Sequence, residues 1–199
     1  MGAVLHAETA PDLVHPVIGF RLWRIDDAGL RSLYHDERWS RGRHTARCAA
    51  GRLAEHDEPS PAHSCTCGIY AWYEPCPRLA WAGSDSLVGG AVVLWGQIEL
   101  HGTGMRAQHV MVVGLALPLT HGPKRRRIVS VADSLEAEAV PARRLAAVAK
   151  RHGQPVPSEL KPRCAPARAG AVVQRDPRAD WLDPARARSR RRGRGSGSG

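Results

Sequence analysis

The sequence predicts an α+β fold: a small mixed or antiparallel β domain, which could take the form of an open barrel, with a C-terminal helical segment and a disordered tail. Three observations support this prediction. Alternating or short apolar segments, typical of strands, recur at residues 17–26, 67–73 and 87–118. A helical pattern is confined to residues 131–152. The last part of the chain is rich in arginine, proline and glycine and has too few apolar residues to form a packed core.

The domain limits follow from the same patterns. We expect a flexible N-terminus at residues 1–16, a β-rich domain at 17–153 that includes the helical segment, and a disordered Pro/Arg-rich tail at 154–199. Residues 1–16 show no basic segment followed by an apolar run, so we recognise no secretory signal. No stretch approaches the roughly 20 apolar residues that a membrane span requires. We therefore expect a cytoplasmic protein that does not enter a membrane.

The first strand pair is expected near the start of this domain. Residues 17–26 (VIGFRLWRID) are typical of a strand, residues 26–29 (DDAG) of a turn, and residues 30–34 of a returning strand. Residues 40–64 show neither a strand nor a helix period and predict a long loop.

An aromatic strand is expected after this loop, at residues 67–73 (CGIYAWY). Because side chains alternate along a strand, Tyr70 and Trp72 share one face. The other face carries Ile69, Ala71 and Tyr73, and we expect one of the two faces to be partly exposed.

A long hairpin is expected in the second half of the domain. Two apolar runs within residues 87–118 flank a glycine-containing loop at 101–104. With that loop, one face carries the facing pairs Leu100/Met105, Ile98/Ala107, Leu94/Met111, Val92/Val113 and Val88/Leu117. The same register places Glu99 opposite Arg106 and Gln97 opposite Gln108 on the other face.

The helical segment is expected at residues 131–152. Ser130 or Asp133 would cap its start, Pro141 would split or kink it, and Gly153 would end it.

The charge of the chain is strongly uneven. Residues 1–120 carry a balance of −2 and residues 121–199 carry +12, which together give the net charge of +10. Arginines in the tail could therefore bind the phosphate backbone of a nucleic acid through charge. A solvated tail without a partner is the equally weighted alternative. The candidate nucleic-acid-binding residues are Arg186, Arg188, Arg190, Arg191, Arg192 and Arg194.

Two sequence blocks carry a resemblance. At residues 65–72 (CTCGIYAW) and 94–108 (LWGQIELHGTGMRAQ) the chain resembles a group of short, uncharacterised actinobacterial proteins. These have a C-x-C-G-I-Y-A block and a W-G-x-[IV]-x-x-H-x-x-G-x-R-A block. The resemblance covers roughly residues 17–152, supports the domain limits and implies no activity. It implies that the group's pattern includes Cys65, Cys67, Gly68, Trp95, Gly96, His101, Gly104, Arg106 and Ala107.

Cysteine and histidine side chains form a candidate metal site. In a reducing compartment the five cysteines are expected as thiols, metal ligands or buried small side chains. Cys65 and Cys67 project from the same side of an extended chain, and Cys48 with His56 would complete four ligands for zinc. His63 is the alternative to His56, whose distance along the chain better allows a loop to close around the metal. The alternative without metal is a pair of partly buried thiols beside a strand.

A catalytic alternative uses the same cysteines. Cys65 or Cys67 could serve a cysteine-dependent enzyme or redox protein, for example with His109 as the base that activates Cys67. A histidine on an apolar face is more commonly a core residue, and His101 lies at the hairpin loop. Motifs for a serine nucleophile elbow, a phosphate loop and a dinucleotide fold do not occur in the sequence.

The aromatic residues offer one further surface. They could form a stacking platform for bases or a planar ligand, or they could pack in the core, where we expect Trp95 beside Val93 and Val110. The set comprises Trp23, Trp39, Tyr70, Trp72, Tyr73 and Trp95. We therefore expect a noncatalytic binding module, with a cysteine-dependent enzyme or redox protein as the alternative.

Overall fold

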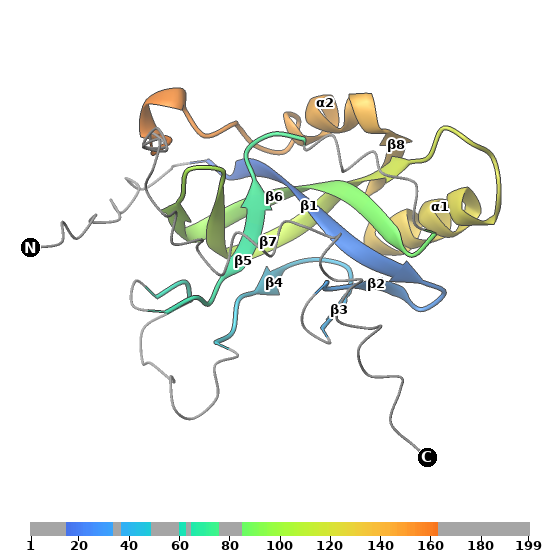
Figure 1. Ribbon diagram of the computed structural model, residues 1–199, viewed down its shortest axis with the longest axis horizontal. Coiled ribbons are helices and arrows are strands. Elements are labelled where there is room, and N and C mark those ends of the chain that lie inside the picture. Colours follow the sequence, from blue (N-terminus) through green and yellow to red (C-terminus); the bar gives the residue numbers. More distant parts are fainter. Residues whose placement is uncertain (1–14, 34–36, 49–59, 63–64, 76–84, 163–199) are drawn as a thin grey trace, which may run out of the picture. The chain divides into compact units, whose positions relative to one another are not determined.

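The computed structural model describes residues 15–33, 37–48, 60–62, 65–75 and 85–162. Within these ranges the chain forms an eight-stranded mixed sheet and two helices, which confirms the predicted fold class (Figure 1). The strands are β1 (Val17–Asp26), β2 (Gly29–Arg31), β3 (Arg38–Trp39), β4 (His44–Thr45), β5 (Ile69–Trp72), β6 (Leu87–Leu100), β7 (Gly104–Leu117) and β8 (Glu138–Pro141). The helices are α1 (Pro123–Leu135) and α2 (Leu145–Ala149), with 3₁₀ turns at Ala142–Arg144 and Ser158–Leu160. No helix in the described ranges combines the length and apolarity that crossing a membrane requires.

Four strands pair in a ring. β6 pairs antiparallel with both β1 and β7, and β5 pairs antiparallel with both β7 and β1. The ring is closed by a single residue pair, Phe20 with Trp72, so the sheet is ring-like without forming a clear barrel. β7 is the central strand, because its free edge takes up β5, β4 and β8 one after another.

The long hairpin of β6 and β7 follows the predicted register near its loop and again at Gly90 and Ala91. Leu100 faces Met105, Ile98 faces Ala107 and Glu99 faces Arg106, as predicted. A bulge between Trp95 and Ile98 then shifts the register by one residue, and a second irregularity after Ala91 shifts it back.

Two predicted pairs are therefore wrong. Leu94 faces Val110 instead of Met111, and Val92 faces Val112 instead of Val113. Because a shift of one residue exchanges the two faces of a strand, the bulge places Leu94 and Val110 in the same buried cluster.

The N-terminal hairpin and the aromatic strand occur where expected. β1 has the predicted bounds, while the returning strand β2 is shorter than expected. In β5, Ile69 and Ala71 are buried, whereas Tyr70 is 42% exposed, so the predicted alternation is confirmed. Within the predicted loop 40–64, a two-residue strand, β4, pairs with His109 and Val110 of β7.

The predicted helix at 131–152 is wrong as a single element. α1 begins at Pro123, so Ser130 and Asp133 lie inside it and do not cap its start. Proline fits this position because the first N–H groups of a helix have no partner within the helix. Glu136, in the left-handed conformation, ends α1, and β8 then pairs in parallel with β7 up to Pro141.

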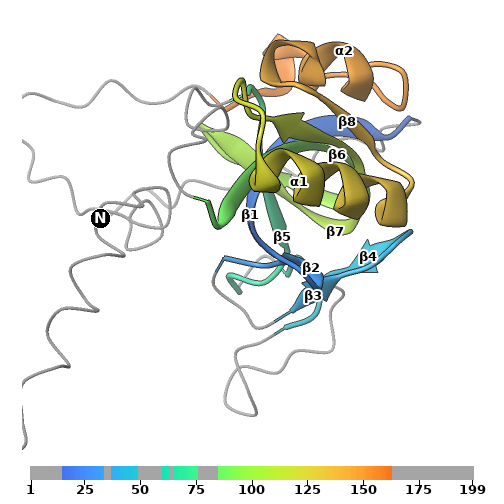
Figure 2. The same cartoon turned by 90° about the vertical axis from the view of Figure 1, so that its right-hand side faces the viewer.

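The core extends over both faces of the sheet. On one face, α1 contributes Ile128, Val131, Ala132 and Leu135 to the larger apolar cluster. On the other, α2 contributes Leu145 and Ala149 to a cluster with Phe20 and Val93. In both views α2 lies on the other side of the β6–β7 hairpin from β2, β3 and β4 (Figure 1 and Figure 2).

The described part of the domain continues beyond residue 153, where the tail was expected to begin. Ile18 donates a backbone hydrogen bond of 2.9 Å to Gln154. Val156 is buried in the larger cluster, so these residues complete the core beside β1.

Candidate metal centre

Three cysteines come together at one edge of the sheet. The sulfur atoms of Cys48, Cys65 and Cys67 all lie within 4.8 Å of one another. Cys48 Sγ and Cys65 Sγ are 3.6 Å apart, well beyond the ~2.05 Å of a disulfide. Ligands at ~2.3 Å from a tetrahedral zinc ion have sulfurs about 3.8 Å apart. The three sulfurs are therefore close enough together to hold one metal ion.

The pairing of β4 and β5 with β7 explains why these cysteines meet. β4 ends where Thr45 pairs with His109, and Ala46 N–H then donates to the carbonyl of Gln108 at 2.7 Å. β5 begins where Ile69 pairs with Ala107. The chain thus leaves the edge of β7 and returns to it at nearly the same point. Cysteines just after β4 and just before β5 are consequently brought together.

The local backbone shapes the Cys65–Cys67 turn. Gly68 has φ +117°, and a Cβ there would lie 3.0 Å from Pro61 Cβ and 3.1 Å from Arg106 Cβ. Cys65 N–H donates to the carbonyl of Ala62 at 3.1 Å. Ala62 N–H in turn donates to Cys67 Sγ at 3.3 Å, in a buried position. The Cys67 sulfur is thus held by the backbone of the same turn that contains Cys65.

The cysteines differ in exposure. Cys67 is 8% exposed, whereas Cys48 and Cys65 are half-buried. Cys48 and Cys65 are therefore the more accessible members of the cluster, while Cys67 is buried.

Both candidates for the fourth ligand, His56 and His63, lie outside the described residues. Among the described residues the metal-ligating group consists of the three cysteines alone. His44, the described histidine nearest to Cys48 in sequence, is within 2.9 Å of the Ser40 carbonyl through Nε2 and stacks on Trp39.

The residues of the catalytic alternative have other partners. His109 Nδ1 is 3.0 Å from Thr45 Oγ1, and its ring lies beside Trp95. Burial, assisted by the charge of Arg43, lowers the pKa of His109 below its ordinary value. His109 thus contacts Thr45, and Cys67 accepts a hydrogen bond from Ala62. Neither contact is the pairing of His109 with Cys67 that base catalysis would require. His101 Nε2 lies 3.4 Å from Glu99 Oε1.

The aromatic set divides between core and surface. Trp23, Trp39 and Tyr73 are buried, while Tyr70 is exposed. Trp95 packs with Val93 as expected, but Val110 belongs to the other cluster because of the bulge at Gly96. These positions leave only part of the set available for stacking on a ligand.

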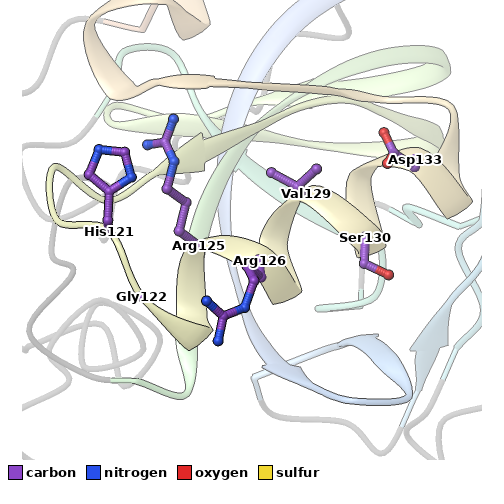
Figure 3. A pocket seen from close by; sticks show the side chains of 7 residues that line it. All are labelled: His121, Gly122, Arg125, Arg126, Val129, Ser130 and Asp133. Atoms are coloured by element: carbon purple, nitrogen blue, oxygen red, sulfur yellow. The ribbon is translucent and has the colours of Figure 1, made fainter.

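The predicted tail arginines, 186–194, also lie outside the described residues. Within the described part of the basic C-terminal region, a surface hollow of about 480 Å³ lies along α1 (Figure 3). Its walls include His121, Arg125 and Arg126, but the two guanidinium groups extend in different directions from the helix (Figure 3). Arg125 is held by the carbonyl of Pro118 at 3.2 Å. The hollow is basic without presenting a convergent anion site.

Comparison with protein families, with curated proteins and with solved structures finds no match to this chain.

Proposed function

We propose that this chain is a noncatalytic binding module in which Cys48, Cys65 and Cys67 hold a zinc ion. The observation that carries the proposal is the convergence of the three sulfur atoms within 4.8 Å. His56 is the proposed fourth ligand, with His63 as the alternative. Bound zinc would supply ligand bonds across the chain between β4 and β5, and thereby stabilise the 40–68 loop.

The chemistry of the donors favours zinc over harder cations. Thiolates are soft ligands, which select zinc, copper(I) or iron–sulfur clusters, whereas magnesium and calcium require oxygen. A fourth protein ligand would close the coordination shell, and closed four-ligand sites are typical of structural zinc. This supports a binding module more than a metalloenzyme.

Elemental analysis of the purified protein tests the metal. We expect near-stoichiometric zinc in the wild-type protein and its loss in Cys48→Ser and Cys67→Ser, because each removes one sulfur ligand. Cys164→Ser, which changes a cysteine outside the ligand set, is the matched control and should retain zinc. His56→Ala and His63→Ala identify the fourth ligand.

Two outcomes contradict the proposal. Wild-type protein without zinc removes the metal site altogether. Zinc that persists at full occupancy in Cys48→Ser or in His56→Ala rejects that residue as a ligand.

The alternative function, a cysteine-dependent enzyme or redox protein, is favoured by one observation. Cys48 and Cys65 are half-buried and 3.6 Å apart, which is close enough for a disulfide to form after a small movement. The rate of alkylation by iodoacetamide separates the two functions. A single rapidly reacting thiol supports the redox or catalytic function, whereas thiols protected until a chelator is added support the metal site.

The tail supports a nucleic-acid partner for this module. The balance of +12 in residues 121–199 would attract phosphate backbones, and arginines 186–194 supply the densest charge. This part of the proposal requires no sequence-specific contact.

A further inference from the structure

A buried arginine lies directly behind the cysteine cluster. Arg106 is on β7, is 2% exposed, and is one of the largest fully buried side chains among the described residues. Across the hairpin it faces Glu99, and the two side chains form an ion pair. An ion pair in such a position loses its hydration, so it contributes little to stability by itself. Its placement therefore calls for another explanation.

The N–H groups of Arg106 are directed to the cysteine turn as well as to Glu99. Nε donates to Glu99 Oε2 at 2.9 Å, and Nη2 donates to the same oxygen. Nη1 donates to the carbonyl of Cys67 at 2.9 Å and to that of Cys65. Nη2 also donates to the carbonyl of Ala62 at 3.1 Å. These contacts use all five N–H donors that a guanidinium offers.

The three carbonyls define the cysteine turn. Ala62 receives the Cys65 N–H through its carbonyl and donates its own N–H to Cys67 Sγ. One rigid cation thus fixes the peptide groups that determine where both Cα–Cβ bonds point. Lysine cannot substitute, because its ammonium has three donors on a flexible stem instead of a planar fork.

We propose that Arg106 is a positioning residue that prearranges Cys65 and Cys67 for metal binding, with Glu99 orienting its guanidinium. The inference rests on the proposed zinc site. Residues that orient metal ligands from behind raise affinity because the site does not have to be assembled when the ion arrives. Arg106 reaches the ligands only through their carbonyls and does not itself touch the metal.

Arg106→Lys tests this role against a matched control, Arg21→Lys. Arg21 also donates to a carbonyl near the cysteine turn, that of Tyr70 at 2.6 Å in β5, and to Ser32 Oγ at 3.2 Å. With competing chelators, we expect Arg106→Lys to lower zinc affinity roughly 10- to 100-fold, as for other residues that support metal ligands. Arg21→Lys should leave zinc affinity unchanged even if the protein becomes less stable.

A second variant and a metal-free measurement complete the test. Glu99→Gln keeps the carbonyl contacts of Arg106 but weakens its orientation, so it should reduce zinc affinity less than Arg106→Lys does. If Arg106→Lys does not fold, Glu99→Gln still tests whether Arg106 positions the cysteine turn. In metal-free protein, iodoacetamide should modify Cys67 faster in Arg106→Lys than in wild type or Arg21→Lys, because the turn no longer holds its buried sulfur.

The outcomes separate this inference from the proposed function. Wild-type protein that binds no zinc overturns the metal site, and the Cys67 alkylation rates then decide alone whether Arg106 holds the turn. If zinc binds but Arg106→Lys and Glu99→Gln match Arg21→Lys in affinity, the positioning role is overturned while the metal site stands. Unchanged Cys67 alkylation in Arg106→Lys also overturns it.

Discussion

At the scale of single residues, the position of His109 disfavours its charged form. Burial is the main cause of its lowered pKa, the charge of Arg43 adds to it, and Nδ1 lies 3.0 Å from Thr45 Oγ1. A group with a lower pKa in the folded state binds fewer protons than in the unfolded chain. Below the ordinary histidine pKa of about 6.5, protonation of the unfolded chain therefore destabilises the fold.

Replacing His109 tests the predicted direction in which stability changes with pH. Wild-type stability should fall as the pH drops from about 7 to 5, and His109→Gln should lose less stability over the same interval because the titrating ring is gone. Thermal unfolding of both proteins at matched pH values measures the difference. Zinc and the carboxylates act on both proteins alike, so they cancel in the comparison. Parallel pH profiles would show that His109 does not titrate as described.

The sequence predicted two of the residue pairs at the candidate site but not the contacts that join them. Glu99 opposite Arg106 follows from strand register alone, and the grouping of Cys65 with Cys67 follows from their spacing. The contacts of Arg106 with the carbonyls of Cys65 and Cys67 could not be predicted, because they join two distant segments.

At the scale of the elements, the bulge in β6 determines which residues face the core. Gly96 has φ +78°, a conformation that other residues rarely adopt, and a Cβ there would lie 2.6 Å from Gln108 Oε1 and 2.9 Å from His109 Cδ2. Glycine at this position permits the extra residue and the register shift between Trp95 and Ile98.

Gly96→Ala should therefore destabilise the hairpin. Gly42→Ala is the control, because Gly42 has φ +90° but nothing within 4 Å of a Cβ. Both substitutions carry backbone strain of about 1–3 kcal/mol, and only Gly96→Ala adds crowding against Gln108 and His109. Denaturant unfolding measures both losses. A loss for Gly96→Ala no larger than that for Gly42→Ala would mean that the neighbours adjust without cost.

The same scale shows why the helical segment was misplaced. Four consecutive basic residues, 124–127, occupy the first turn of α1, where the helix dipole disfavours positive charge. Basic residues are typical of the C-terminal end of a helix, so the sequence predicted a helix that begins after them. Pro123 at the first helical position was the signal that could have found it. The parallel pairing of β8 with β7 is a long-range contact that no local pattern contains.

At the scale of the whole molecule, β7 organises both the core and the candidate site. Its neighbours β6 and β5 were predicted as strands, because their apolar patterns are strong. The two-residue strand β4 has no such pattern, yet its pairing with β7 brings Cys48 to Cys65 and Cys67. The position of Cys48 therefore depends on tertiary contacts, although its identity as a candidate ligand came from composition and spacing.

The uneven charge of the molecule predicts which part of the chain would bind nucleic acid. Because residues 1–120 carry −2 and residues 121–199 carry +12, binding of DNA or RNA should depend on the C-terminal region. Each phosphate neutralised on duplex DNA contributes about −0.9 to the slope of log affinity against log salt. Deleting residues 186–199 removes six arginines and should flatten this slope without unfolding the domain. The basic residues of α1 remain in the truncated chain, so its residual slope measures the contribution of the folded domain. Filter binding or fluorescence anisotropy at low and moderate salt gives both slopes.

Equal binding by the two chains would exclude the tail as the contact surface, and sequence-selective binding by the truncated chain would point to Tyr70 and Trp72. If neither chain binds at low salt, where charge attraction is strongest, this protein has no general affinity for nucleic acid.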